Sequence, residues 1–457
     1  MSGSSFSGHS HASTQHGQSP SPNADTRAPG NDPLRIGRLP IHFFVFAVIS
    51  FAIGVCAAPL VIGQISDYFY QAYPLALVHT FTLGWITATI MGVMYRYVPA
   101  LTHHPISYPR LALWQLWIFI LGATGMIVHF ALGVWFGMWS AAIVVVGTVV
   151  LFAINMTPCL YRELGRGVAE TGMFLSICML IVAGSVGAML GMDKDYNFLG
   201  GDVISNLAGH VHLAAMGWVT LTICAVSYRM LPAFLLPEIT LPRSAVWQLW
   251  TLCFSVLLLG AILLLGWPGA SILAIVACLS LSAYIVTIGR LVRSRRMPID
   301  STSRHAIAGI FWLVLSMIGG IILSFTGAQS LAGGRIAAAY GVVGVLGFFS
   351  NFIIGMSYQL FPGFVTRSRM ILGWPMASIS ELSIRGPRWF VFAAFNAGVA
   401  VVAGGLLIGS AKTALVGSIM IEAAGLGYAL PTLWTLSWAY RRSVPAASHS
   451  PLRVLPS

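Results

Sequence analysis

The sequence predicts an all-α membrane protein whose twelve transmembrane helices form a pseudo-threefold bundle of three four-helix repeats. Apolar residues make up 57% of the chain and charged residues only 8%, and the mean hydropathy is +0.84. A chain of this composition cannot keep its apolar faces in water, so it belongs in a lipid bilayer. A sequence pattern that recurs three times at nearly constant spacing predicts the threefold arrangement.

The apolar segments are long enough to cross a membrane, because a helix rises about 1.5 Å per residue and the hydrocarbon layer is about 30 Å thick. We expect twelve spans, at residues 41–64, 74–99, 111–134, 137–158, 170–191, 205–232, 245–266, 269–291, 306–327, 336–361, 389–410 and 413–438. They form one membrane domain over residues 41–438, with repeats at about 41–158, 170–291 and 306–438.

The ends of the chain and the connections are polar. Residues 1–33 are rich in Ser, Gly, His, Asn and Pro, and they predict a disordered N-terminal arm, while residues 439–457 form a C-terminal tail. Arginines cluster at every second connection, so the positive-inside rule predicts that both termini are cytoplasmic, in an inner membrane. The formal net charge of +12 is therefore interpreted as a topology signal and not as a nucleic-acid interface.

The internal repeat lies in the second, sixth and tenth spans. In each copy a Gly lies five residues after a first position and is followed directly by an aromatic residue, and a tyrosine lies 16 residues after the first position. The three copies are His79-x4-Gly84-Trp85 with Tyr95, His212-x4-Gly217-Trp218 with Tyr228, and Val342-x4-Gly347-Phe348 with Tyr358, at offsets of 133 and 130 residues. The repeated helix is expected to line the middle of the bundle.

Histidines in these spans are the candidate functional residues. His79 and His212 share the first repeat position, His210 lies half a turn further out, and His129 falls at similar depth in the third span. Metal-ligating groups cost free energy in lipid, and histidines from different helices of a bundle can clamp a heme. We predict cofactor ligation by His79, His210 and His212, and metal ligation by His129; hydrogen bonding to one another and to backbone carbonyls is the alternative. His305 is expected at the membrane interface.

The stretch Gly209-His210-Val211-His212-x4-Gly217-Trp218, with a tyrosine and a proline downstream, resembles the tenth helix of subunit I of heme-copper oxidases, especially C-type oxidases and nitric-oxide reductases. The resemblance implies twelve helices in pseudo-threefold order, with hemes toward the outer side. It also implies that His210 is the axial ligand of a high-spin heme and that His212 ligates a low-spin heme. The resemblance covers residues 41–438 in topology, and its residue matches lie in the repeat helices.

The chain departs from that family because the histidine pair lies on the sixth span instead of the tenth. His79 then falls where the family places a copper ligand, and Val342 stands where a low-spin ligand is expected. Two arrangements remain open. In the first, which needs fewer missing ligands, His79 and His212 clamp one low-spin heme and leave His210 and His129 for a second heme or metal. In the second, His210 holds a five-coordinate heme that faces a metal site of His79 and His129.

The expected function is that of a membrane heme protein in electron transfer or diatomic gas chemistry, with a redox partner such as a cytochrome at the periplasmic face. Its six cysteines form no heme-attachment motif, which implies b-type heme, and copper stays open. Acidic residues are nearly absent from the spans, Glu422 being the clearest, so a proton-pumping oxidase is not expected. The sequence leaves open whether the chain is an enzyme; if it is one, we expect an oxidoreductase. The alternative functions are a histidine-lined transporter or channel, and a heme-free assembly or partner subunit.

Overall fold

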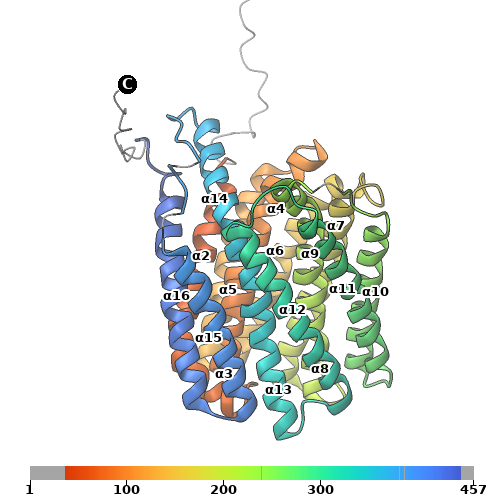
Figure 1. The fold of residues 1–457 in the computed structure, drawn as a ribbon. Helices are drawn as coiled ribbons and strands as arrows, with labels where there is room; N and C mark the ends of the chain where they lie inside the picture. The colour runs from red at the N-terminus through yellow and green to blue at the C-terminus, as the bar shows by residue number, and fades with distance from the viewer. Residues whose placement is uncertain (1–36, 238, 380, 385, 444–457) are drawn as a thin grey trace, which may run out of the picture.

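The computed structural model describes residues 37–443 except 238, 380 and 385 (Figure 1). The predicted N-terminal arm, residues 1–33, lies outside the described residues, as does the tail beyond residue 443. The described chain consists of helices and short connections, without a strand, which confirms the all-α class. Twelve of its helices are long and apolar enough to cross a membrane, so the protein is a multi-pass membrane protein whose outer helices contact lipid.

Each repeat contributes four spans, and the second span of each is divided into three segments. The first repeat comprises α2 (Leu39–Asp67), α3 (Ala72–His79) with η1 (Thr80–Thr87) and α4 (Ala88–Thr102), α5 (Pro109–Leu132) and α6 (Trp135–Tyr161). The second comprises α7 (Val168–Tyr196), α8 (Val203–His212) with η2 (Leu213–Thr220) and α9 (Leu221–Leu235), α10 (Ser244–Leu265) and α11 (Ala270–Arg293). The third comprises α12 (Ser301–Thr326), α13 (Leu331–Val342) with η3 (Val343–Ser350) and α14 (Asn351–Ile371), α15 (Arg388–Ile408) and α16 (Ala411–Ser437).

The segments η1, η2 and η3 are π-helical, and each begins directly after the first position of the sequence repeat. A π-helical turn holds an extra residue, which rotates the side chains on its two sides by about 100° relative to a regular helix. The repeat glycines lie within these segments and allow close packing: a Cβ at Gly84 would lie 2.6 Å from Ser50 Cβ, and one at Gly347 would lie 2.7 Å from Trp312 Cγ. Each glycine therefore lets the first span of its repeat approach the second.

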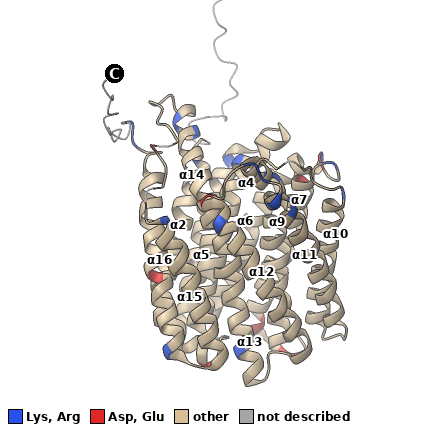
Figure 2. Cartoon of the chain, viewed as in Figure 1, with Lys and Arg blue, Asp and Glu red and all other residues tan. Residues whose placement is uncertain are grey.

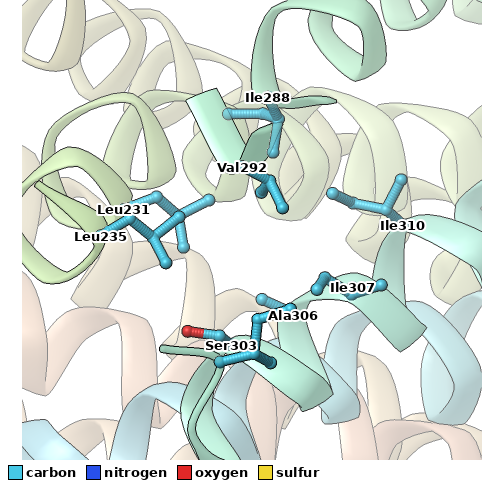
Figure 3. A pocket seen from close by; sticks show the side chains of 9 residues that line it. Leu231, Leu235, Ile288, Val292, Ser303, Ala306, Ile307 and Ile310 are labelled. Carbon is cyan, nitrogen blue, oxygen red and sulfur yellow. The ribbon is translucent and has the colours of Figure 1, made fainter. Parts of the chain in front are cut away.

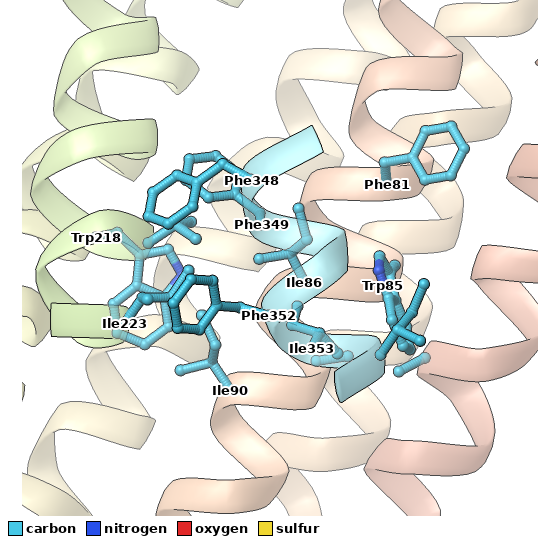
Figure 4. Close-up of a cluster of buried hydrophobic side chains, with 14 of the residues drawn as sticks. Phe81, Trp85, Ile86, Ile90, Trp218, Ile223, Phe348, Phe349, Phe352 and Ile353 are labelled. Carbon is cyan, nitrogen blue, oxygen red and sulfur yellow. The ribbon is translucent and has the colours of Figure 1, made fainter. Parts of the chain in front are cut away.

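The three repeated spans meet at the centre of the bundle (Figure 4). The repeat-equivalent residues Ile90, Ile223 and Ile353 are only 7–8% exposed. Trp218 and Phe348, drawn with them in Figure 4, are 2% and 1% exposed. Side chains therefore fill the pseudo-threefold axis.

Two indole hydrogen bonds join the repeats around this axis. Trp85 Nε1 donates to Ser350 Oγ over 3.3 Å, and Trp218 Nε1 donates to Thr87 Oγ1 over 3.1 Å. Both acceptors occupy one repeat position, two residues after the aromatic residue of their own repeat. The third repeat has Phe348 at the donor position, and a phenyl ring has no N–H group to complete the ring of bonds.

The two ends of the bundle differ in charge (Figure 2). Most of the Lys and Arg residues drawn in blue lie at the upper end of Figure 2, where the connections at 103–108, 162–167, 236–243, 294–300 and 372–387 are found. We call this the basic end. Six connections lie at the opposite end, and the chain between 327 and 330 is one of them.

The tenth span, Leu331–Ile371, is longer than the predicted 336–361 at both ends. Ser330 caps its start, because Ser330 Oγ accepts a hydrogen bond from Gly333 N over 3.0 Å. At the basic end the fully buried Arg369 fixes the extension. Its guanidinium donates to the carbonyl oxygens of Pro375, Trp438, Arg441 and Ser443 at 2.7–2.9 Å.

Candidate functional site: histidines on three helices

The four predicted histidines lie in the half of the bundle away from the basic end. His79 ends α3, His210 and His212 end α8, and His129 lies in the last turn of α5. Each is within ten residues of the end of its span that faces away from the basic end. All four side chains are half-buried, so their rings still present accessible surface.

Three of these rings are held by the same local hydrogen bond, between Nδ1 and the carbonyl oxygen four residues earlier. A carbonyl oxygen only accepts, so each ring donates from Nδ1, and in the neutral ring Nε2 then carries the lone pair. Histidines that bind metals or heme iron are oriented by bonds of this kind. The bonds are His79 Nδ1 to Leu75 O, His129 Nδ1 to Gly125 O and His212 Nδ1 to Ala208 O, each 2.7 Å long.

His210 is oriented differently, by a neighbouring helix. Its Nδ1 donates to the Ala183 carbonyl oxygen of α7 over 3.0 Å. Gly187, one turn further along α7, makes room for the ring, since a Cβ there would lie 2.6 Å from His210 Cε1. The imidazoles of His210 on α8 and His79 on α3 lie near enough that a positive charge on one would repel a positive charge on the other. We call the region between these two rings the α3/α8 gap; it brings together histidines from two repeats.

On α5 the side chain beside His79 is Phe130 and not His129. The rings of His79 and Phe130 stack with centroids 4.7 Å apart and an interplanar angle of 20°. The ring of His129 instead lies over Gly137 of α6, where an added Cβ would overlap it. Within the described part of the chain, no three His, Cys, Asp or Glu side chains are placed to hold a metal ion. Metal ligation by His129 stays a prediction.

His212 faces the third repeat. Its Nε2 lies 3.5 Å from the hydroxyl oxygen of Tyr340 on α13, and the two rings are 6.1 Å apart with an interplanar angle of 26°. We call this the α8/α13 gap. Tyr340 was not among the residues predicted from the sequence, although it lies two residues before Val342 and so takes the same repeat position as His210.

The two gaps are equivalent by the repeat. Each gap contains two residues from consecutive repeats. One is the first-position residue of the earlier repeat, and the other is the residue two places before the first position of the next repeat. The α3/α8 gap pairs His79 with His210, and the α8/α13 gap pairs His212 with Tyr340. Residues two apart on a helix point about 200° apart, which is why His210 and His212 reach different gaps.

His305, which the sequence places at the membrane interface, is enclosed by protein. It is 1% exposed, and its ring shares a 2.8 Å hydrogen bond between Nδ1 and Asn351 Oδ1. Asn351 and Asn396 bond to each other, and Trp312 Nε1 donates to Asn396 Oδ1 over 2.7 Å. This polar network explains why a histidine can be enclosed at the start of α12.

The small cavity in Figure 3 does not add to the site. It lies between the basic-end parts of α9, α11 and α12 and has a volume of about 10 Å³, roughly the space of one water. Its lining is aliphatic except for Ser303. Such a cavity has no group that would ligate a metal or a heme.

A scan of protein-family models and a search of curated proteins found no match for the chain. The function proposed below therefore rests on the residues and their geometry.

Proposed function

We propose that the protein is a membrane b-type heme protein that transfers electrons, and that His210 and His79 would hold the heme in the α3/α8 gap. The observation that supports this most is that two imidazoles from different repeats lie near each other, and that each has Nδ1 bonded to a carbonyl oxygen. In both neutral rings Nε2 therefore keeps its lone pair, and these are the atoms that would ligate a heme iron. A bound heme supplies a one-electron couple.

The surrounding residues orient the ligands and exclude water. The Leu75 and Ala183 carbonyl oxygens set the ring positions and make both imidazoles stronger ligands. Phe130 stacks on His79 and supplies an apolar wall. Gly187 keeps the space that the His210 ring needs.

The geometry supports this pairing over the two arrangements expected from the sequence. In the first arrangement His79 and His212 would hold one heme between them. The neighbour of His212 is Tyr340, however, so the rings of His79 and His212 lie at different gaps. A metal site of His79 and His129 would require the place that Phe130 takes beside His79. We retain from the resemblance to heme-copper oxidase subunit I the proposal that the chain is a divergent relative, with His210 as a heme ligand.

A channel along the pseudo-threefold axis is less well supported. Ile90, Ile223 and Ile353 close that axis, and Trp218 and Phe348 pack beside them. The positive-inside rule places the basic end in the cytoplasm. On that orientation the α3/α8 gap lies in the outer half of the membrane, where a periplasmic redox partner reaches it across a short distance.

The test is absorption spectroscopy of the protein purified from a heme-replete host. We expect a Soret band, sharp α and β bands on reduction, and a pyridine hemochrome of b type. His210→Ala should lose the heme. His129→Ala is the matched control, because this ring has the same Nδ1 bond as His79 but faces α6, and it should keep the heme. Wild-type protein without heme would make the proposal wrong and leave a heme-free subunit as the better account.

Carbon monoxide separates electron transfer from gas chemistry. With both axial positions filled, reduced wild-type protein should not change its spectrum under CO. His79→Ala opens one position and should bind CO. Rapid CO binding by the wild type would instead indicate a five-coordinate iron and a function in gas chemistry.

A further inference from the structure

Tyr340 takes the place in the third repeat that His210 takes in the second, and it faces His212 as His210 faces His79. The phenol ring lies beside two glycines of α12: a Cβ at Gly319 would lie 3.4 Å from Tyr340 Cδ2, and one at Gly320 would lie 3.7 Å from Cε2. These glycines let the tyrosine side chain lie close to α12 and point its hydroxyl group at His212.

The hydrogen-bond partners of His212 differ from those of the two proposed heme ligands, His79 and His210. Its Nδ1 donates to the Ala208 carbonyl oxygen, so its Nε2 is an acceptor. The Tyr340 O–H group lies 3.5 Å away and is the donor that faces it. Among the described residues, His79 Nε2 and His210 Nε2 have no hydrogen-bonding partner of this kind.

A neutral phenol is a poor substitute for an imidazole as a heme ligand at neutral pH, because its unperturbed pKa is about 10 and it binds iron well only as the phenolate. The neighbouring first position of the third repeat is Val342, which has no donor atom. The α8/α13 gap thus offers one imidazole, already faced by a hydroxyl group, where the α3/α8 gap offers two.

We infer that Tyr340 determines the number of hemes: it closes the α8/α13 gap to a second heme, and the chain holds one heme, in the α3/α8 gap. This inference rests on the proposed function. It assigns His212 to a hydrogen-bonded pair with Tyr340, in place of the ligand role that the sequence predicts. Because the two gaps are equivalent by the repeat, a histidine at position 340 would recreate the His79–His210 pair on the other side of α8.

The test measures heme per chain by pyridine hemochrome and protein assay in Tyr340→His, with Tyr340→Phe as the matched control. Tyr340→His should raise the ratio from about one to about two, with a matching rise of the low-spin bands, because it adds a second imidazole pair. Tyr340→Phe removes the hydroxyl group without adding a ligand and should stay at about one heme per chain. His212→Ala should also keep the wild-type heme.

Several results would overturn the inference while leaving the proposed function in place. These are two hemes in the wild type, loss of heme in Tyr340→Phe or His212→Ala, and a well-folded Tyr340→His protein that keeps a single heme. If Tyr340→His fails to fold, the wild-type ratio and the other two variants still decide. Wild-type protein without heme would overturn the proposed function and this inference together.

Discussion

The α3/α8 gap and the α8/α13 gap are built from the same two positions of one repeated element, yet they present different chemistry. The first gap brings His79 and His210 together, and the second brings His212 against Tyr340. The backbone is alike in both, since a π-helical segment begins directly after His79 and again directly after His212. Side-chain identity at two positions, and not the fold, therefore sets the chemistry that each gap presents.

We expect the largest effect on the α3/α8 gap from a substitution that removes the space for the His210 ring. In Gly187→Ala the new Cβ meets the His210 ring at 2.6 Å, so the ring must move away from its place in the gap. We expect heme affinity to fall about 10–100-fold, as for other changes that disturb ligand orientation. Heme titration of the apoprotein measures this. Gly137→Ala, which displaces His129 in the same way, is the control and should keep wild-type affinity.

The third repeat differs from the first two in a second respect, the Arg369 clamp at the basic end. Arg369→Met leaves the carbonyl oxygens of Pro375, Trp438, Arg441 and Ser443 without this donor. Each buried carbonyl that loses its partner costs about 1–3 kcal/mol, reduced where water can enter. We expect a clear fall in the midpoint of thermal unfolding in detergent, with unchanged heme content per folded chain. A variant that unfolds at the wild-type temperature would show that the clamp does not stabilise the fold.

The ring of indole bonds allows a smaller test. Trp218→Phe gives the second repeat the residue that the third already has in Phe348, and it removes the 3.1 Å bond to Thr87. The expected loss is about 1 kcal/mol for the hydrogen bond, with a further small loss for the reduced volume. Chemical denaturation in mixed micelles measures it. Trp250→Phe, at a half-buried position on α10, serves as the control.

The smallest expected effect concerns Asp202, which caps α8 and links it to the third repeat. Its carboxylate accepts hydrogen bonds from Ser205 N at 2.8 Å and from Gln329 Nε2 at 3.1 Å. Partial burial raises the pKa of the Asp202 carboxyl, but these hydrogen bonds outweigh burial and hold the pKa below its ordinary value. A lowered folded pKa gives stability that is present above the unfolded value of about 3.9 and is lost as the pH falls through the folded value.

For this reason Asp202→Ala should cost about 0.5–1 kcal/mol at pH 7 and less near pH 3. Unfolding midpoints at the two pH values measure the difference. The same loss at both would mean that the ionised carboxylate is not what stabilises the start of α8.

The sequence was informative about the spans because bilayer thickness dictates the length of an apolar helix, and all twelve are found where they were expected. The sequence predicted the bounds of the tenth span less accurately. Ser330 and Arg369 extend that span through hydrogen bonds, which a hydropathy pattern cannot predict. The π-helical segments were also not predicted. They depend on packing of one span against another, although the repeated Gly84, Gly217 and Gly347 mark where they lie.

For the candidate site, the sequence supplied the residues but not their pairing. The depth of His79, His210 and His212 follows from counting along the spans. Which rings meet depends on helix rotation, and the rotation of α5 brings Phe130 to His79 in place of His129. Tyr340 was overlooked because a tyrosine near the end of a span is common at membrane interfaces, and only the threefold comparison gives it meaning.

The π-helical segment η3 bears on the ancestry of the protein. It begins directly after Val342, which has no atom to offer a ligand, yet it keeps the same length as its two counterparts. Duplication of one ancestral unit would account for a backbone irregularity that is kept where no ligating side chain stands. On the proposed function, each copy would supply the same backbone frame, and a single amino-acid replacement would gain or lose a ligand without remodelling the chain around it.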